Sequence, residues 1–339
     1  MHATRGRQRL VLMAWLALFV LPASRLAAQD AENSADGPLL FAGDGFVPDH
    51  EHAPVDVQAR PMVSRFAVAL MRPRRLLVEE DGRVIVADWG AGTVVEIDPD
   101  GQATVLATGL DEPAGLARDA FGTLYVSTHA EGISGEGTVV RLAGGSMPLP
   151  FVEGLTGPTD IAFGPDGYLY VAAFHENTVL RVAPEGGLIM IAATVPSPAA
   201  LAFDPAGLLH VASSTDGAVF RLLPMGEVEL VTRDLHMPSD LAFDPEGHLI
   251  VANYGARELS YVEPLGRTRT FAVVPEGTIA LDFDADGNLL FVNWDGQYLM
   301  KVTTNLAIPC PHCGQPIPVR LREPPRGEPE TAGLSKPVT

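Results

Sequence analysis

The fold is decided by the segment Pro-Thr-Asp-Ile-Ala-Phe-Gly-Pro-Asp-Gly-Tyr-Leu-Tyr-Val-Ala, residues 158–172, because versions of it recur along the chain. A two-residue element ending in glycine marks each copy, at Asp81-Gly82, Phe121-Gly122, Asp166-Gly167, Ala206-Gly207, Glu246-Gly247 and Asp286-Gly287. These elements are 40 residues apart, except for one interval of 45. Short apolar runs between glycine turns indicate strands, and about four strands per forty residues predicts the blade of a β-propeller.

The two ends of the repeat region complement each other. The sixth copy contains three strand-like runs, within residues 279–303, and lacks a fourth. Residues 64–71 have the pattern of a fourth strand without the first three. An unpaired sheet edge is prone to aggregation, so we expect this segment to complete the last blade. The sequence therefore predicts an all-β, six-bladed β-propeller of four-stranded blades over residues 63–304, with a flat array of repeats as the alternative.

The first 28 residues have the composition of a secretory signal peptide. Arg5, Arg7 and Arg9 precede an apolar run at 10–23, and small residues follow up to Ala28. The run is shorter than the roughly 20 residues of a membrane span, although an uncleaved anchor is the alternative. Cleavage would remove four arginines and no acid, which takes the formal charge from −19 to −23. We expect an exported protein, periplasmic or extracellular, without a membrane span.

Composition limits the partners of the chain. The sequence has 23 Lys and Arg against 42 Asp and Glu, a balance that argues against binding to the nucleic-acid backbone. Residues 29–62 are polar and contain several prolines, so we expect a flexible leader. The 47% hydrophobic content indicates a folded remainder.

The repeat resembles a known group of proteins. Proline, an apolar strand, an Asp-Gly turn and Leu-Tyr-Val-Ala are similar to NHL-repeat propellers and to the wider group of SMP-30/gluconolactonase-type and streptogramin-lyase-like propellers. The resemblance covers about residues 63–304. It implies the six-bladed fold strongly and an activity only weakly, because propellers carry many functions.

One face of the ring should carry the ligand site. Successive strands of a blade are antiparallel. The loop that enters the first strand and the loop that joins the second strand to the third therefore lie on the same face of the ring, and the glycine turns lie on the opposite face. The residues that we expect to bind a ligand there are Arg75, Asp88, Trp89, His129, Asp160, His175, Asp240, Asn253, Tyr254, Asn293 and Trp294. The polar members have a structural alternative, since such side chains also bond backbone amides. The aromatic rings either pack between blades or stack on a ring-bearing or sugar-like ligand.

The second copy is five residues longer than the others, and the extra length falls within residues 130–137. This loop is expected on the same face. It either overhangs the site or is a tolerated surface insertion.

The resemblance also implies enzymatic residues that this sequence lacks. Gluconolactonase-like relatives bind a divalent cation through acid and amide side chains directly after the proline, where this chain has Arg74, Ala114, Thr159, Ala199 and Ser239. Streptogramin-lyase-like relatives have a histidine there, which is also missing. Asp160 and Asp240 lie one residue later, so we expect them to point to the other side of the strand.

The tail, residues 305–339, contains Cys-Pro-His-Cys at residues 310–313. A disulfide between Cys310 and Cys313 suits an exported protein, whereas zinc needs four ligands. Ring closure would bring His50 and His52 near, which gives a Cys₂His₂ clasp as the sharper alternative.

We therefore predict a binding module for a small molecule, a saccharide or a protein. No cofactor is firmly indicated. The alternative is an enzyme, a lactonase-type hydrolase or a lyase, with a calcium or zinc ion held by Asp160, Asp240, Asn253 and Asn293.

Overall fold

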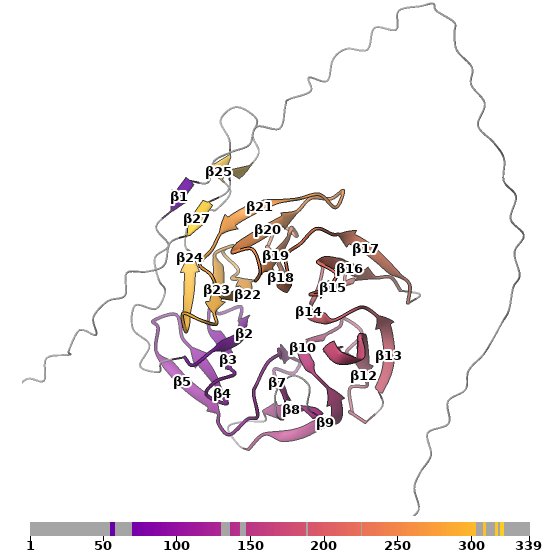
Figure 1. Cartoon of the computed structure of the whole chain (residues 1–339). Coiled ribbons are helices and arrows are strands. Elements are labelled where there is room, and N and C mark those ends of the chain that lie inside the picture. Colours follow the sequence, from indigo (N-terminus) through magenta and orange to yellow (C-terminus); the bar gives the residue numbers. More distant parts are fainter. Residues whose placement is uncertain are drawn as a thin grey trace, which may run out of the picture. The chain divides into compact units, whose positions relative to one another are not determined.

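The computed structural model describes residues 55–57, 70–129, 136–142, 147–187, 189–224, 226–302, 308–309, 316–317 and 319–321. Within these ranges the chain forms antiparallel blades around an axis (Figure 1). The first blade contains β2 (Pro73–Val78), β3 (Val84–Asp88), β4 (Thr93–Ile97) and β5 (Ala103–Ala107). The second contains β6 (Leu116–Arg118), β7 (Leu124–His129), β8 (Glu136–Leu142) and β9 (Leu149–Thr156).

The remaining blades repeat this order. The third contains β10 (Pro158–Phe163), β11 (Leu169–Ala173), β12 (Thr178–Val182) and β13 (Ile189–Thr194). The fourth contains β14 (Pro198–Phe203), β15 (Leu209–Ser213), β16 (Ala218–Leu222) and β17 (Val228–Thr232). The fifth contains β18 (Pro238–Phe243), β19 (Leu249–Asn253), β20 (Glu258–Val262) and β21 (Thr268–Val273). The sixth contains β22 (Thr278–Phe283), β23 (Leu289–Asn293) and β24 (Tyr298–Val302).

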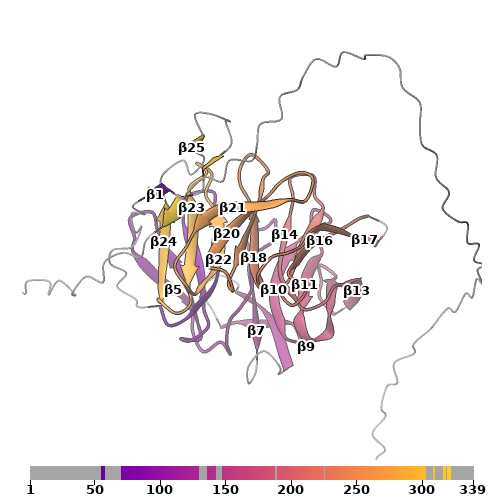
Figure 2. The same cartoon turned by 45° about the horizontal axis from the view of Figure 1, so that its top comes forward.

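The blades close into a ring, which confirms the predicted six-bladed propeller. The innermost strand of each blade contacts that of the next, and β22 of the last blade contacts β2 of the first. Figure 2 shows β10, β14, β18 and β22 side by side along the axis. The predicted closing strand, residues 64–71, lies outside the described residues except for its last two. Of these, Leu70 is buried in the apolar core between the first and sixth blades.

Apolar cores lie between neighbouring blades. Six clusters of buried Val, Leu, Ile and Ala side chains fill the six interfaces, as in the contact of Ile250 and Leu259 with Leu289 and Phe291 between the last two blades. Burying one such side chain contributes roughly 1.5–3 kcal/mol. Successive side chains of a strand point to opposite faces of the blade. Alternate residues therefore pack against the preceding blade and against the following blade.

The glycine turns repeat one local structure. In the fourth blade, the Asp204 Oδ1 atom accepts hydrogen bonds from the backbone N–H groups of Ala206 and Leu208, both at 2.9 Å. Gly207 has a φ of +82°, which L-residues rarely adopt. This requirement explains the regular spacing of glycine in the sequence.

Short strands also occur in the two segments that flank the repeats. β27 (Val319–Leu321) pairs in parallel with β21 of the fifth blade, and β1 (Val55–Val57) pairs in parallel with β27. β25 (Ile308–Pro309) and β26 (Pro316–Ile317) form an antiparallel pair. A one-turn 3₁₀ helix, η1 (Phe174–Glu176), follows β11. Among the described residues, no helix has the length and apolar character needed to cross a membrane.

Candidate functional site

The face opposite the glycine turns, here called the funnel face, has a feature that sequence reasoning missed. The residue directly before the recurring proline (Thr278 in the sixth blade) has a left-handed backbone, at Arg72 (φ 93°), Glu112 (45°), Gly157 (61°), Ser197 (39°), Met237 (52°) and Gly277 (84°). A non-glycine residue in this conformation is strained by about 1–2 kcal/mol. In the third to sixth blades, the carbonyl of this residue accepts the N–H of the residue after the second strand, as in Trp294 to Gly277 at 2.8 Å. The periodic position just before the proline was the available signal.

The polar residues that end the second strands hold the connections of the funnel face. The Asp88 Oδ2 atom accepts the N–H of Met71 at 2.7 Å, and burial raises the pKa of Asp88. The Asn253 Oδ1 atom accepts the N–H of His236 at 3.2 Å, and the Asn293 Nδ2 atom donates to the Glu276 carbonyl at 2.7 Å. These three side chains are buried and bond the connection that leads into the first strand of their own blade.

Aromatic residues follow these positions and form a wall across three blades. The Trp89 ring lies 4.9 Å from that of His129 and 5.9 Å from that of Trp294, between ring centroids. The Arg72 guanidinium lies 5.7 Å from the centre of the Trp294 ring. Trp89 and Trp294 are half-buried, as is Tyr254 in the fifth blade. One side of the funnel therefore carries rings that a planar ligand could stack against.

His129 is the buried member of this wall. Its side chain has no exposed surface, and neither ring nitrogen has a hydrogen-bond partner among the described residues. Burial lowers the pKa of His129 to about 4, with a smaller contribution from the positive charge of Arg74, while an interaction with the Pro158 backbone opposes the lowering. The imidazole is therefore neutral at pH 7. His175 lies exposed in η1, with its ring centroid 5.1 Å from that of Phe174.

Arg75 closes the axis of the ring. Its Nη2 atom lies 2.9 Å from the Asp160 Oδ2 atom of the third blade, and its Nη1 atom pairs with Asp240 Oδ1 of the fifth. Each carboxylate also accepts a backbone N–H from the next blade, from Leu201 at 2.8 Å and from Leu281 at 2.9 Å. Burial raises the pKa of Asp160, and the charge of Arg75 opposes this rise. The structure thus brings together three of the predicted ligand residues, in an ion-pair network with one another.

A β-bulge separates Arg75 from its neighbour Arg74. The pairing of β2 with β3 shifts between Pro73 and Arg75, so that Arg74 is the additional residue. The first strands of blades three to six have the same shift after their first residue. A bulge changes the direction in which side chains point. The strict alternation of side chains between the two faces of the strand, which the sequence analysis assumed, therefore does not hold at the start of these strands.

Arg74, at the start of the innermost strand β2, forms what is here called the funnel floor; it is partly buried and lies near Asp160, His129 and Tyr254. The equivalent residues of the other blades are small or apolar, namely Ala114, Thr159, Ala199, Ser239 and Ile279. The Thr159 and Ser239 hydroxyls donate to carbonyls of the next blade at 2.9 and 2.8 Å. Arg74 forms no hydrogen bond or ion pair with the described residues. Burial lowers its pKa; the charge of Asp160 opposes this most strongly, while the charge of Arg75 adds to the lowering to a smaller extent.

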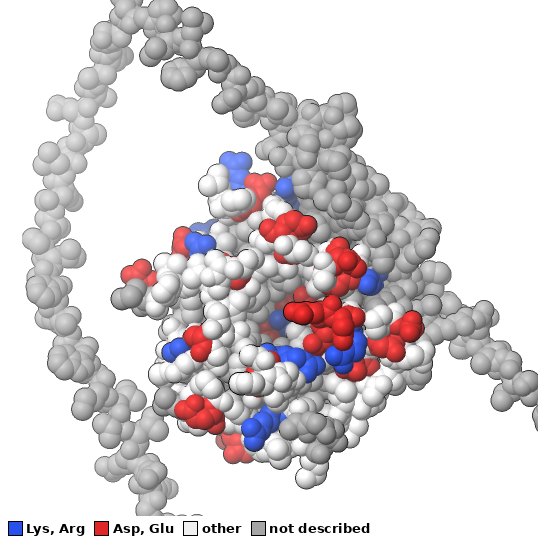
Figure 3. Space-filling view, turned by 180° about the vertical axis from the view of Figure 1, so that it is seen from behind, with Lys and Arg blue, Asp and Glu red and all other residues white. Residues whose placement is uncertain are grey.

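The axis also contains a small cavity on the side of the glycine turns. It has a volume of about 230 Å³ and is lined by Arg75, Asp282 and apolar residues such as Phe203 and Phe243. Burial raises the pKa of Asp282 to about 6, although the carboxylate accepts the N–H groups of Val78 and Phe283. Sequence reasoning missed Asp282, whose signal was an acid at a position where the other blades have Ala or Leu. Figure 3 shows one face of the ring hollowed near its centre, with charges of both signs around the hollow.

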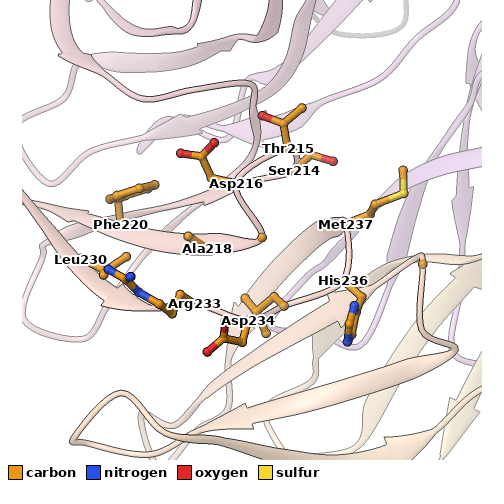
Figure 4. A pocket seen from close by; sticks show the side chains of 13 residues that line it. Ser214, Thr215, Asp216, Ala218, Phe220, Leu230, Arg233, Asp234, His236 and Met237 are labelled. Atoms are coloured by element: carbon orange, nitrogen blue, oxygen red, sulfur yellow. The ribbon is translucent and has the colours of Figure 1, made fainter.

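A larger groove of about 940 Å³ lies between the fourth and fifth blades on the funnel face (Figure 4). Its walls are the connection at residues 214–217, which joins β15 to β16, and the connection at residues 233–237, which leads into β18. Ala218, Phe220, Leu230 and Gly255 complete the lining.

The described residues contain one cluster with the donors for a metal ion. Asp244, Glu246 and His248 have ligand atoms within 4.8 Å of one another on a glycine turn of the fifth blade. The His248 Nδ1 atom lies 2.9 Å from Asp244 Oδ2. Cys310, Cys313, His50 and His52 lie outside the described residues, as do residues 130–135 of the long loop, so the predictions for them stay predictions.

Comparison with known proteins identifies the fold. No family model and no curated protein matches the sequence. A gluconolactonase from Xanthomonas campestris is similar in structure, with a TM-score of 0.60 and 16% identity over 76% of this chain and 98% of that chain. Virginiamycin B lyase from Staphylococcus aureus has a TM-score of 0.54 and 15% identity over 70% and 86%.

A third similar structure, a streptogramin B lyase, has a TM-score of 0.54 and 16% identity over 68% of this chain and 78% of that chain. The predicted resemblance to gluconolactonase-type and streptogramin-lyase-type propellers is confirmed at the level of the fold.

Proposed function

We propose that this propeller is an exported binding protein that takes a small, ring-bearing organic anion in its funnel. The observation that carries the proposal is Arg74, a guanidinium in the funnel floor that forms no direct ion pair or hydrogen bond with the described residues, while Asp160, the carboxylate whose charge acts on it, is already paired with Arg75. A desolvated cation without a partner is unfavourable, and a carboxylate that pairs with both of its N–H edges removes that cost.

The surroundings of Arg74 support a ligand with a ring. Trp89, Trp294 and Tyr254 present half-buried aromatic surface beside the funnel floor, and ring stacking contributes roughly 0.5–1.5 kcal/mol beyond the area that it buries. His129 is neutral and fully buried behind the Trp89 ring, which it supports. These groups match a planar or sugar-like body with polar substituents.

Export remains part of the proposal and rests on the sequence of residues 1–28. A positively charged start, an apolar core and small residues before the cleavage site support it. The excess of acidic residues in the rest of the chain would keep an exported protein soluble.

A hydrolase or lyase is the second candidate, and His129 is the observation that favours it. One of the similar structures is a catalytically inactive His-to-Ala variant of virginiamycin B lyase with quinupristin. In this chain His129 is neutral and adjacent to a cation, as a general base would be. A pKa of about 4 makes it a weak base at pH 7, however, because an effective base titrates near the working pH.

The arrangement at the axis favours the binding protein over a metal-dependent lactonase. Asp160 and Asp240 are both paired with Arg75, so a divalent cation would have to displace a guanidinium. Asn253 and Asn293 bond backbone and side-chain groups of their own blades. A hard cation needs several converging oxygen ligands.

Isothermal titration calorimetry tests the proposal with three carboxylates, benzoate, 2-naphthoate and D-glucuronate, and with uncharged benzamide and 2-naphthamide. We expect binding of at least one carboxylate and at least tenfold weaker binding of its amide. Arg74→Gln should weaken carboxylate binding at least tenfold, or about 1.4 kcal/mol. Arg221→Gln is the matched control, because this arginine pairs with Glu229 on the outer strands of the fourth blade.

Absence of carboxylate binding at millimolar concentration, or equal affinities of the wild type and Arg74→Gln, contradicts the proposal. Turnover of a lactone panel by the wild type that is lost in His129→Asn would instead establish the second candidate.

A further inference from the structure

Arg72 is a second cation beside the aromatic wall that Trp89, His129 and Trp294 form. It lies exposed in the connection that leads into β2. Its guanidinium lies over the Trp294 ring, 5.7 Å from the ring centre, and forms no ion pair with the residues that the structure describes. A guanidinium that stacks on a ring uses its flat face for this contact. Its N–H edges therefore stay available for a planar acid group.

The position of Arg72 in the repeat is unusual for an arginine. The equivalent residues of the other blades carry no positive charge, namely Glu112, Gly157, Ser197, Met237 and Gly277. Arg72 has a φ of 93°, a conformation that glycine adopts without strain and arginine does not. Strain of this kind persists where the surrounding structure fixes it, and it gathers at ligand sites.

The backbone next to Arg72 is held in place. The Met71 N–H donates to Asp88 Oδ2 at 2.7 Å. A Cβ atom on Gly90 would collide with the Met71 carbonyl oxygen, so only glycine allows the connection between β3 and β4 to approach this closely. These two contacts fix the backbone from which the Arg72 side chain projects. A cation on a fixed backbone binds an anion at a smaller entropic cost than a cation on a mobile loop.

Arg72 and Arg74 border the same aromatic wall. Their Cα atoms are no more than about 7.6 Å apart, twice the spacing of consecutive Cα atoms. The positive charge of Arg74 acts on His129. The centroid of the Trp89 ring lies 4.9 Å from that of His129 and 5.9 Å from that of Trp294. The row of rings therefore has Arg74 near its His129 end and Arg72 over its Trp294 end.

We infer that the ligand is a ring-bearing dianion, with one acid group bound at Arg74 and a second acid group bound at Arg72. The inference rests on the proposed function of the funnel and adds the class of ligand. The formal charge of the whole chain is −19, which at long range disfavours a dianion more than a monoanion. A preference for two acid groups therefore has to come from cations at the site itself.

The experiment compares two dicarboxylates, isophthalate and terephthalate, with their monoamides, 3-carbamoylbenzoate and 4-carbamoylbenzoate, by isothermal titration calorimetry. Each monoamide has the shape of its dicarboxylate and one charge fewer. At least one dicarboxylate should bind about tenfold or more tightly than its monoamide, because an arginine–carboxylate pair is a strong, charge-assisted contact. Arg72→Gln should reduce this preference to about twofold or less and leave the monoamide affinity within about threefold of the wild type.

A second variant and a control complete the test. Arg72→Gly removes the same charge and suits the left-handed backbone, so it keeps the test valid if Arg72→Gln does not fold. Arg233→Gln is the matched control, because Arg233 is an exposed arginine of the funnel face that forms no ion pair with the described residues. This control changes the net charge equally and should keep the full preference for the dicarboxylate. Arg74→Gln should weaken the binding of all four probes.

The outcomes separate the two claims. The dianion is overturned, and the funnel proposal left standing, by a wild type that binds dicarboxylates and monoamides with equal affinity. The same holds for a preference that survives in folded Arg72→Gln or Arg72→Gly, or that Arg233→Gln also abolishes. Failure of the wild type to bind any of the four probes overturns the funnel proposal and the dianion with it.

Discussion

Arg74 and Arg75 are neighbours on one strand, yet the axis and the funnel floor give them opposite surroundings. Arg75 forms direct ion pairs with two carboxylates at the axis, whereas Arg74 forms no direct ion pair with the described residues and is influenced by the charge of Asp160 only from a distance. A balanced buried charge holds the blades together, and an unbalanced one attracts a ligand. The comparison shows that two residues of the same type on the same strand can have different roles, so residue type and strand position together do not identify a binding site. The partners of the charge do.

The largest expected effect is on stability, from the loss of the axial cation. Arg75→Met leaves Asp160 and Asp240 buried without their partner, so we expect a loss of about 3–5 kcal/mol in the free energy of unfolding. Arg74→Met removes a cation that forms no direct ion pair and should stay within about 1 kcal/mol of the wild type. Urea unfolding at pH 7 measures both, and equal losses in the two variants would remove the distinction between the two arginines.

The second effect is a pH dependence at the axis. Burial raises the pKa of Asp282 to about 6 in the folded protein, whereas an unfolded aspartate titrates near about 3.9. The folded state binds the proton more tightly, so the contribution of Asp282 to stability is full below pH 4 and is lost as the pH rises through 6. The stability of the wild type relative to Asp282→Asn should fall by about 2–3 kcal/mol between pH 4 and pH 7.

Urea unfolding at four pH values across this range checks the prediction. Asp81→Asn is the control, because Asp81 is exposed and its hydrogen bond to Arg83 lowers its pKa. The difference between wild type and this control should change in the opposite direction. A difference between wild type and Asp282→Asn that is the same at every pH contradicts the account.

The smallest effect is a shift of one pKa in the funnel. The positive charge of Arg74 contributes to the lowering of the His129 pKa, after burial. Arg74→Gln should therefore raise the pKa of His129, by roughly half a unit, because burial remains the larger cause. NMR titration of the imidazole signals measures this shift. An unchanged pKa in the variant would show that Arg74 does not lie against His129.

The periodicity of the sequence is sufficient to predict the ring. The recurring proline, glycine turn and strand pattern placed Trp89, His129 and Trp294 at equivalent positions, and the structure brings these three rings into contact. Equivalent positions in consecutive blades lie at the same height of a propeller, so a column in the alignment of repeats becomes a ring of residues in space.

The pairing at the axis could not be predicted in the same way. Arg75 and Asp240 are 165 residues apart in the chain, and no local pattern specifies which blades exchange charges across the ring. The β-bulge at Arg74 leaves no clear mark in the sequence either, which is why the sequence singled out Arg75 and not Arg74. The parallel pairing of β27 with β21 likewise joins segments that have no repeat pattern.

The most direct test of the account is a crystal structure of the protein soaked with 4-bromobenzoate, with the bromine located by its anomalous signal. The account predicts bromine in the funnel, with the carboxylate bonded to the Arg74 guanidinium. Bromine bound elsewhere on the protein, or a carboxylate that binds Arg75 after displacing Asp160 and Asp240, would contradict it.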